Sequence, residues 1–273
     1  NIIYCTVTGY GMTGPYSEKP AFDPLLQAES GAMAAEGGED NPPVFLRIPI
    51  TDYSASILAA YGVAAALFHR ARTGQGQRLE TSLLNAAIAV QAEEFLSYPG
   101  KEPSPRVGSL GLSSTYRHYQ ASDGWLFLSC GDDESWRKMC EVLGRTDLAE
   151  KYPDKATRTK NDAEIGADLE SVFSTKVRQH WLSRLQAARV KNAPSRHSWY
   201  LHEDPQAIHL GLTVDADSPD AGPIKQMGLP FRFSRTPGKI WGPSPSQGQH
   251  TDEVLSEMGF SPREIAELRE RDV

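Results

Sequence analysis

Hydrophobic and β-branched residues dominate the start of the chain and predict a strand. Residues 1–7 read Asn-Ile-Ile-Tyr-Cys-Thr-Val and end at a cluster of glycines, which is typical of a short buried strand. Residues 8–20 are rich in Gly and Pro and predict a loop. Residues 22–35 have an apolar side that predicts a helix, and the polar, proline-bearing residues 36–50 predict a second loop.

The clearest predicted element is a long apolar helix over residues 53–72. Its interior is rich in Ala, Leu and Ile. Its last turn holds cations, which suit the negative end of a helix dipole: His69, Arg70 and Arg72. Gly74 follows as a C-terminal stop, because glycine adopts the left-handed conformation that commonly ends a helix.

The same helix bears on membrane association. Its longest apolar run, Ile57 to Phe68, has twelve residues, whereas a membrane span needs about 20. We therefore expect a helix buried in a soluble protein and no membrane contact. Thr51 or Asp52 is a natural N-cap, since a short side-chain oxygen accepts from a free amide of the first turn.

The rest of the chain alternates between short strands and helices. Residues 78–84 alternate in polarity and predict a strand, and an Ala-rich helix follows over about 84–97. Residues 99–114 predict a linker or active-site loop, and residues 205–245 an extended segment. A hairpin is predicted from residues 116–119 and 125–129, with helices over 133–143, 161–174, 177–188, 249–258 and 262–271.

Composition and charge narrow the classes of function. The chain has 273 residues, 39% of them hydrophobic, which is enough for a core. The net charge of −7 does not favour a phosphate backbone, so we expect no nucleic-acid partner. The odd, widely spaced cysteines predict free thiols in a reducing compartment, here the cytoplasm: Cys5, Cys130 and Cys140.

Two apparent motifs carry little weight. Gly9 to Gly14 match the dinucleotide fingerprint, but Pro15 and Pro20 interrupt the helix that must open at those glycines, so NAD binding is rejected. Three histidines lie close in sequence without the spacing or partners of a zinc set: His197, His202 and His209. We expect no metal site.

Asp52 is the carboxylate with two open interpretations. A capping role explains an acid at the start of a helix. The positive end of the helix dipole also stabilises its ionised form, and an ionised carboxylate beside an apolar wall is a possible nucleophile. The later segment Thr73 to Arg78 holds two glycines between a helix and a strand, which a tight turn explains fully.

Taken together, seven segments resemble the class III CoA-transferase family, of the formyl-CoA transferase and carnitine CoA-transferase type, in order and spacing. They are GYGMTGPY (9–16), FDPLLQAESG (22–31), TDY (51–53), TGQGQR (73–78), DGW (123–125), PFRFSRTP (230–237) and GQHTDEVL (248–255). The resemblance implies an α/β fold with a partial Rossmann-like large domain and a small α+β domain. It also implies a homodimer of two ring-like, interlocked subunits.

The resemblance divides the chain into four segments. Residues 1–98 would be the C-terminal part of the Rossmann-like half, and residues 99–114 a linker and active-site loop. Residues 115–204 would form the small α+β domain. Residues 205–273 would return to pack on the large domain with their helices.

The resemblance also implies chemistry. Asp52 would attack an acyl-CoA thioester and carry CoA to a carboxylic acid through an aspartyl anhydride and an aspartyl-CoA thioester. CoA is then a substrate, and no permanently bound cofactor is expected. The implied CoA-lining segment is Lys19, Pro20, Ala21, Phe22 and Asp23.

The implied substrate loop is poorer in glycine than that of the formyl-CoA transferases. It holds Gly108, Ser109 and Gly111, where those enzymes carry a glycine run, so a formyl or oxalyl substrate is not expected.

Two other functions remain open. A 2-methylacyl-CoA racemase would share the fold, but its acid/base pair includes a histidine where Phe22 stands, and Phe22 cannot transfer a proton. A non-catalytic, dimer-forming remnant is the other alternative. It follows from the start of the chain at Asn1, since the resemblance implies a long preceding region with most of the CoA contacts. We expect this chain to be inactive by itself.

Overall fold

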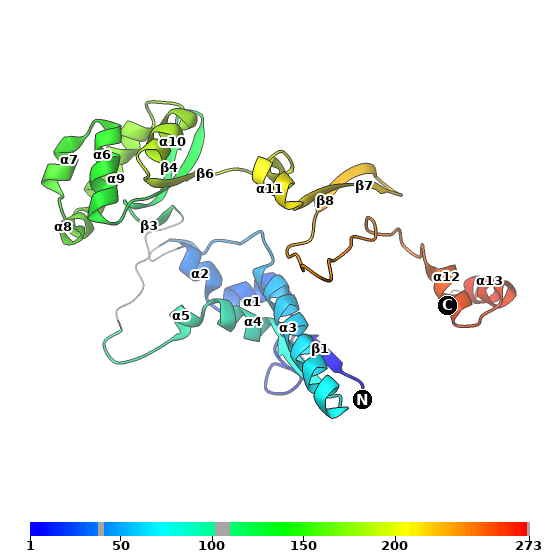
Figure 1. Cartoon of the computed structure of the whole chain (residues 1–273). Helices are drawn as coiled ribbons and strands as arrows, with labels where there is room; N and C mark the ends of the chain where they lie inside the picture. The colour runs from blue at the N-terminus through cyan, green and yellow to red at the C-terminus, as the bar shows by residue number, and fades with distance from the viewer. Residues whose placement is uncertain (38–40, 102–109, 272–273) are drawn as a thin grey trace. The chain divides into compact units, whose positions relative to one another are not determined.

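The computed structural model describes residues 1–37, 41–101 and 110–271, and it combines helices with three small sheets (Figure 1). The predicted mixed α/β class is therefore confirmed. The chain forms two compact units, Asn1–Ser195 and Arg196–Val273.

Two parallel strands open the first unit. Strands β1 (Tyr4–Thr8) and β2 (Arg78–Ser82) pair in register, with Tyr4 opposite Arg78. Helices lie between and after these strands in sequence: α1 (Asp23–Glu29), α2 (Ala32–Gly37), α3 (Ile50–Thr73), α4 (Leu83–Val90) and α5 (Ala92–Phe95). A parallel pair needs such a crossover, and α3 provides it.

Glycines set how closely these elements approach. Gly74 ends α3 with φ of +74° and donates its N–H to the carbonyl of Arg70, as predicted. A Cβ on Gly76 would lie 1.9 Å from the carbonyl oxygen of Ile2, so only glycine lets this turn pass β1. A Cβ on Gly62 would lie 2.8 Å from the side chain of Leu79, so the glycine allows α3 to lie close to β2.

The burial predicted for α3 is wrong within the described residues. Among these residues, α3 is the one helix long and apolar enough to cross a membrane by length and composition, and 17% of its most apolar stretch is buried. Ile57, Tyr61 and Phe68 are 69%, 75% and 65% exposed. The helix contacts β1, β2, α1 and α4, which cover one side of it.

Two further expectations need correction. Tyr4 and Val7 of β1 are exposed, so this strand is not buried in the described chain, where β2 is its one strand partner. The single helix predicted over 22–35 is two helices, because Gly31 adopts φ of +88° and breaks the helical path.

The later part of the first unit has its own core. An antiparallel sheet has the order β3 (Gly111–Ser113), β4 (Tyr116–Ala121), β5 (Gly124–Ser129), β6 (Lys191–Pro194). Helices accompany it: α6 (Asp133–Leu143), α7 (Thr146–Lys151), α8 (Lys155–Lys160), α9 (Asp162–Phe173) and α10 (Arg178–Ala187). Aromatic and aliphatic side chains between Tyr119 and Val190 form one buried cluster.

The hairpin turn of this sheet is fixed by two residues of the DGW motif. Asp123 accepts a hydrogen bond from the backbone N–H of Arg178 at 2.6 Å, at the start of α10. A Cβ on Gly124 would lie 3.2 Å from the Arg178 guanidinium, and φ of +151° at this position also favours glycine. The motif therefore has a structural explanation.

The second unit buries little. Its elements are a 3₁₀ helix η1 (Ser198–His202), α11 (Pro205–Leu210), a hairpin of β7 (Thr213–Ser218) and β8 (Gly222–Met227), α12 (Thr251–Glu257) and α13 (Pro262–Glu270). The extended segment predicted over 205–245 thus begins with a helix, which Asp204 caps by accepting from Gln206 and Ala207. Ala207 and Ile265 are the buried hydrophobic residues of its described part.

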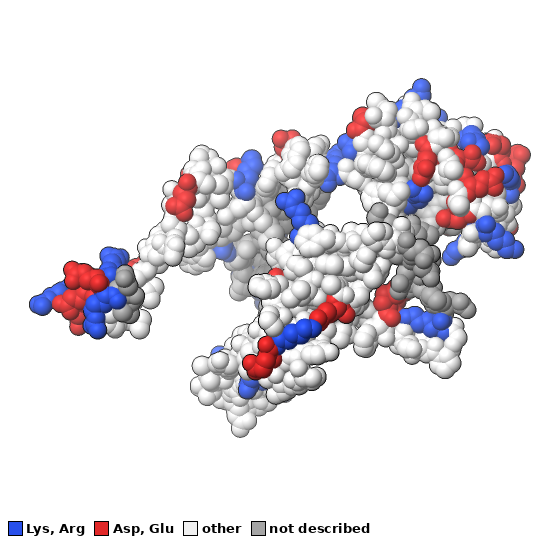
Figure 2. Space-filling view, turned by 180° about the vertical axis from the view of Figure 1, so that it is seen from behind, with Lys and Arg blue, Asp and Glu red and all other residues white. Residues whose placement is uncertain are grey.

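Charged side chains are unevenly spread over the surface. On the face shown in Figure 2, acidic and basic residues gather over the two C-terminal helices and over the helices of the α6 to α9 region. Ser261 and Glu264 form a capping box at the start of α13, which begins at the predicted residue 262.

Candidate active site at the start of helix α3

Asp52 lies in the first turn of α3, and it does not cap this helix. The helix begins at Ile50, with Pro49 at the N-cap position and no side-chain bond from that residue. The predicted capping role of Thr51 or Asp52 is therefore wrong, and the helix starts earlier than the predicted residue 53. The first turn takes its cap from another helix.

That cap is Asp23, in the first turn of α1. One carboxylate oxygen of Asp23 accepts from the backbone N–H of Thr51 at 2.8 Å and from the Thr51 hydroxyl at 2.6 Å. Asp23 is 6% exposed and Thr51 1% exposed. Because the first amides of a helix have no partner within the helix, this contact satisfies one that burial would otherwise leave unpaired.

Gln27 completes the contact from the same helix. It lies one turn after Asp23, is fully buried, and donates from its amide nitrogen to the second carboxylate oxygen of Asp23. The same nitrogen lies 3.2 Å from the carbonyl oxygen of Leu46 and 3.3 Å from that of Ile48. The loop that leads into α3 is thus tied to α1.

The Asp52 carboxylate is accessible and takes no part in these contacts. Its side chain is exposed, and in the described part of the chain it has no hydrogen bond or ion pair. The helix dipole alone would favour its charged form. Partial loss of solvation and then the negative charge of Asp23 act the other way and raise the pKa of Asp52.

The segment Lys19 to Asp23 lies at the start of α1. A Cβ on Gly9 would lie 2.1 Å from the Cβ of Ala21, so the glycine-rich turn lets this segment pass closely. Phe22 is 71% exposed, next to the buried Asp23. The structure therefore brings Phe22 and Asp23 to the helix start that carries Asp52.

Lys19 already has partners. It forms an ion pair with Glu29, and its ammonium lies 5.2 Å from the ring centre of Tyr10 and 4.8 Å from that of Tyr16. The bond to Glu29 raises the pKa of Lys19 and lowers that of Glu29. The side chain of Lys19 remains partly exposed.

Of the three substrate-loop residues, the structure describes Gly111. Gly108 and Ser109 are outside the described residues. Gly111 begins β3, and a Cβ on it would lie 2.4 Å from the carbonyl oxygen of Tyr116, so this glycine is required by the sheet itself.

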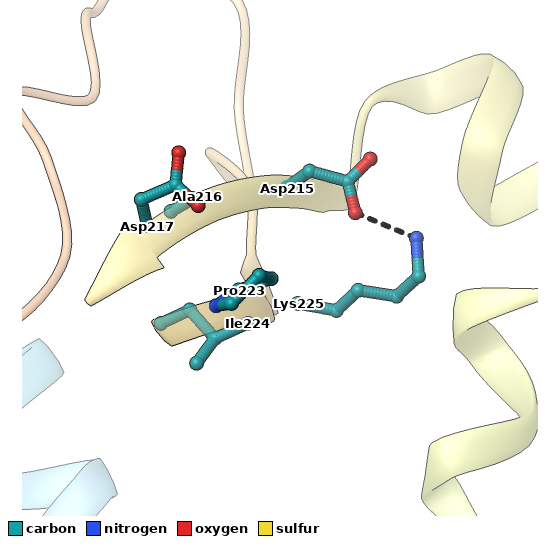
Figure 3. A pocket seen from close by; sticks show the side chains of 6 residues that line it. All are labelled: Asp215, Ala216, Asp217, Pro223, Ile224 and Lys225. Carbon is teal, nitrogen blue, oxygen red and sulfur yellow. Dashed lines mark hydrogen bonds and ion pairs between the residues drawn. The ribbon is translucent and has the colours of Figure 1, made fainter. Parts of the chain in front are cut away.

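Two other hollows of the described chain lack a catalytic grouping of side chains. A cavity of about 310 Å³ lies at the C-terminal end of α1, and its lining includes Glu29, Glu94, Leu84 and Ile88. A second, of about 380 Å³, lies on the β7–β8 hairpin, where Lys225 pairs with Asp215 at 2.7 Å (Figure 3). No cluster of metal-ligating side chains occurs among the described residues.

Sequence reasoning missed Gln27 and Thr51 as parts of the site. The spacing of Asp23 and Gln27 puts both on one helix face, which was a usable signal. Two polar side chains on one helix face are usually solvated, however, and the hydrogen bond from Thr51 to Asp23 joins residues 28 positions apart in the sequence. Only the folded chain reveals it.

The comparison with protein families decides the identity. CoA-transferase family III matches residues 1–251 of the chain. The chain belongs to CoA-transferase family III. Curated members of the family are similar over most of its length. A succinyl-CoA:glutarate CoA-transferase of Mus musculus is 29% identical over 262 residues, and a succinate–glutarate CoA-transferase of Agrobacterium fabrum is 30% identical over 262 residues.

Coverage of these relatives is partial. The two alignments take in 94% of this chain but 60% and 65% of the respective relatives, so the chain spans less than two thirds of their length. A solved CAIB/BAIF family protein from Brucella suis is 28% identical with a TM-score of 0.84, covering 94% of this chain and 68% of that protein. This fold is therefore shared with solved CaiB/BaiF proteins.

Proposed function

We propose that the protein containing this CoA-transferase family III chain transfers CoA from an acyl-CoA donor to a carboxylic acid, with Asp52 as the nucleophile. The observation that carries the proposal is the state of Asp52. Its carboxylate is exposed and unbonded at a helix start whose capping is done by Asp23. A carboxylate freed from structural bonds is available for covalent chemistry.

The first half-reaction forms a covalent enzyme. A carboxylate oxygen of Asp52 attacks the thioester carbonyl carbon of the donor, the C–S bond breaks, and CoA leaves as the thiolate. The product is an anhydride between Asp52 and the acyl group. The thiolate then attacks the Asp52 carbonyl carbon, the donor acid leaves as a carboxylate, and an aspartyl-CoA thioester remains.

The second half-reaction reverses these steps with the acceptor. The acceptor carboxylate attacks the aspartyl thioester, the thiolate leaves, and a second anhydride forms. The thiolate attacks the acyl carbon of the acceptor, which gives the new acyl-CoA and restores Asp52. Atoms and charge balance without a metal or a redox cofactor. CoA is a substrate throughout.

The finer architecture is part of the proposal. We infer that residues 1–98 and 205–273 belong to a Rossmann-like large domain, that residues 115–204 form the small domain, and that two subunits interlock. The exposure of Ile57, Tyr61 and Phe68 on α3 supports this inference, because such an apolar face is normally covered in a soluble protein. A cytoplasmic location fits the free thiols of all three cysteines.

The CoA-lining segment is proposed to act through particular atoms. Both oxygens of Asp23 are already bonded, so a contact from this residue to CoA would use its backbone. Phe22 offers an exposed apolar face. Its ring also favours transfer over racemisation, because it cannot move a proton.

The names of the relatives suggest the first substrates to test. We expect the full-length protein to convert succinyl-CoA and glutarate to succinate and glutaryl-CoA, measured by liquid chromatography with mass detection. Asp52→Asn is isosteric and should lower kcat by on the order of 10³-fold or more. Hydroxylamine should trap a covalent adduct on Asp52 of the wild-type protein after addition of succinyl-CoA.

The matched control is Asp217→Asn. Asp217 is an exposed acid on β7 that is absent from the proposed site, and its replacement should leave kcat unchanged (Figure 3). A fully active Asp52→Asn protein would overturn the proposal. So would wild-type protein that forms no adduct with any acyl-CoA. Solvent deuterium entering the α-carbon of 2-methylacyl-CoA would favour the racemase instead.

A further inference from the structure

A buried polar cluster joins α1 to the start of α3. We call Asp23, Gln27 and Thr51 the Asp23 cluster. Each member is at most 6% exposed, and their side chains bond to one another and to the backbone before α3. A buried carboxylate costs free energy unless its oxygens are paired, and here both oxygens are.

The cluster replaces the ordinary N-cap. Pro49 occupies the N-cap position of α3 and makes no side-chain bond to the helix. The amide of Thr51 instead donates to Asp23, 28 positions earlier. Since Asp52 follows Thr51 directly, the backbone that carries Asp52 is held by the carboxylate of a different helix.

We propose that Asp23 is a positioning residue for the transfer reaction, because it caps α3 from outside and fixes the backbone that carries Asp52. This inference rests on the proposed role of Asp52 as the nucleophile. Displacement of a reacting group by about 1 Å costs on the order of 10²-fold in rate, so a fixed helix start matters for attack on a thioester.

Asp23 also acts on Asp52 by its charge. Partial loss of solvation is the larger cause of the raised pKa of Asp52, and Asp23 is the charged group whose field raises it further. The other elements around α3 offer few charges. Strand β2 carries Arg78 and Glu80, which pair with each other, and Lys19 pairs with Glu29 of α1. The loop before α3 carries the exposed Arg47. Helix α4 has no charged residue, and the titratable groups of β1 are Tyr4 and Cys5. Loss of the Asp23 charge should therefore lower the pKa of Asp52.

The principal variant is Asp23→Asn in the full-length protein. Asparagine keeps the shape but turns its amide nitrogen, a donor, toward either the backbone N–H of Thr51 or the amide nitrogen of Gln27, which are donors too. We expect kcat for succinyl-CoA and glutarate to fall roughly 10- to 100-fold, with KM for succinyl-CoA changed by less than about threefold. The acidic limb of the kcat/KM profile should move to lower pH, which a purely structural defect would not produce.

Two variants at Thr51 test the same role of Asp23 if the Asp23→Asn protein does not fold. Thr51→Val removes the hydroxyl bond to Asp23 and keeps the volume, whereas Thr51→Ser keeps the hydroxyl. We expect Thr51→Val to lower kcat several-fold, less than Asp23→Asn because the amide of residue 51 still donates to Asp23, and we expect Thr51→Ser to keep most of the wild-type rate. The acidic limb should stay in place in both, because Asp23 keeps its charge.

Hydrogen exchange gives a readout that does not depend on activity. In Thr51→Val, or in a folded Asp23→Asn protein, the amides of the first turn of α3 should exchange faster, while those of α6 and α9 stay unchanged. Unchanged exchange at this turn would overturn the inference.

Kinetics separate the two proposals. A folded Asp23→Asn protein with unchanged kcat and pH profile, or equal rates for Thr51→Val and Thr51→Ser, would overturn the role of Asp23 while an inactive Asp52→Asn protein still supports the nucleophile. An active Asp52→Asn protein would remove both proposals.

Discussion

The ionised carboxylate of Asp52 is accessible, but it lowers the stability of the folded protein. It stands where the helix dipole favours a negative charge, yet reduced solvation and the nearby Asp23 raise its pKa. The folded protein therefore binds a proton at Asp52 more tightly than the unfolded chain does. The stability that this proton contributes is fully present below the unfolded pKa and is lost as the pH rises through the folded pKa.

Replacement of Asp52 should consequently stabilise the protein at neutral pH. Asp52→Asn cannot ionise, so it avoids the free-energy cost of the charged form. We expect a small rise in the Tm at about pH 7 that shrinks towards about pH 4, near the pKa of an unfolded aspartate. Thermal unfolding at both pH values checks this, with Asp217→Asn as the control. A lower Tm for Asp52→Asn at neutral pH would contradict the expectation.

At the scale of elements, the glycine turn after α3 has two different constraints. Gly74 needs a left-handed conformation, with φ of +74° and open space around it. Gly76 needs space, because a Cβ would lie 1.9 Å from the backbone of Ile2. The first constraint is conformational and local, whereas the second holds β1 against the turn.

These constraints predict unequal losses of stability. Gly74→Ala should lower the free energy of unfolding by about 1 kcal/mol, the usual cost of a side chain at a positive φ. Gly76→Ala should cost more, about 1 to 3 kcal/mol, because backbone must move to admit the methyl group. Urea unfolding of the two variants measures both, and equal losses would be inconsistent with the close approach to Ile2.

The elements show how far the sequence could predict the fold. Helix α6 matches its predicted range, and the predicted hairpin forms with β4 and β5 longer than predicted, because turn residues and apolar spacing are local signals. The break at Gly31 does not follow from the apolar pattern of residues 22–35, and α7 and α8 are too short, at six residues each, to show a helical period. At the site, Asp52 could be singled out from the sequence, but its distant cap could not.

At the scale of the molecule, burial is concentrated in one region. The cluster between Tyr119 and Val190 includes the fully buried Trp136, Phe173 and Leu169. The unit from Arg196 onward has two buried hydrophobic residues in its described part, Ala207 and Ile265. A segment with so little apolar burial cannot offset its loss of conformational entropy.

The two regions should therefore behave differently when excised. Residues 110–195, expressed alone, should unfold in one cooperative thermal transition because they contain the whole buried cluster. Residues 196–273 should show no cooperative transition alone. Circular dichroism during heating tests both segments, and cooperative unfolding of the second would mean that its exposed aromatic residues pack in isolation.

The contact between Asp23 and Thr51 has a consequence for sequence change over time. Loss of the Asp23 carboxylate would leave the buried hydroxyl and amide of Thr51 without their acceptor, and loss of the Thr51 hydroxyl would remove one of the bonds that Asp23 accepts. We therefore expect the residues at positions 23, 27 and 51 to co-vary among homologous chains. An engineer who transplants α3 with Asp52 into another scaffold must move α1 with it.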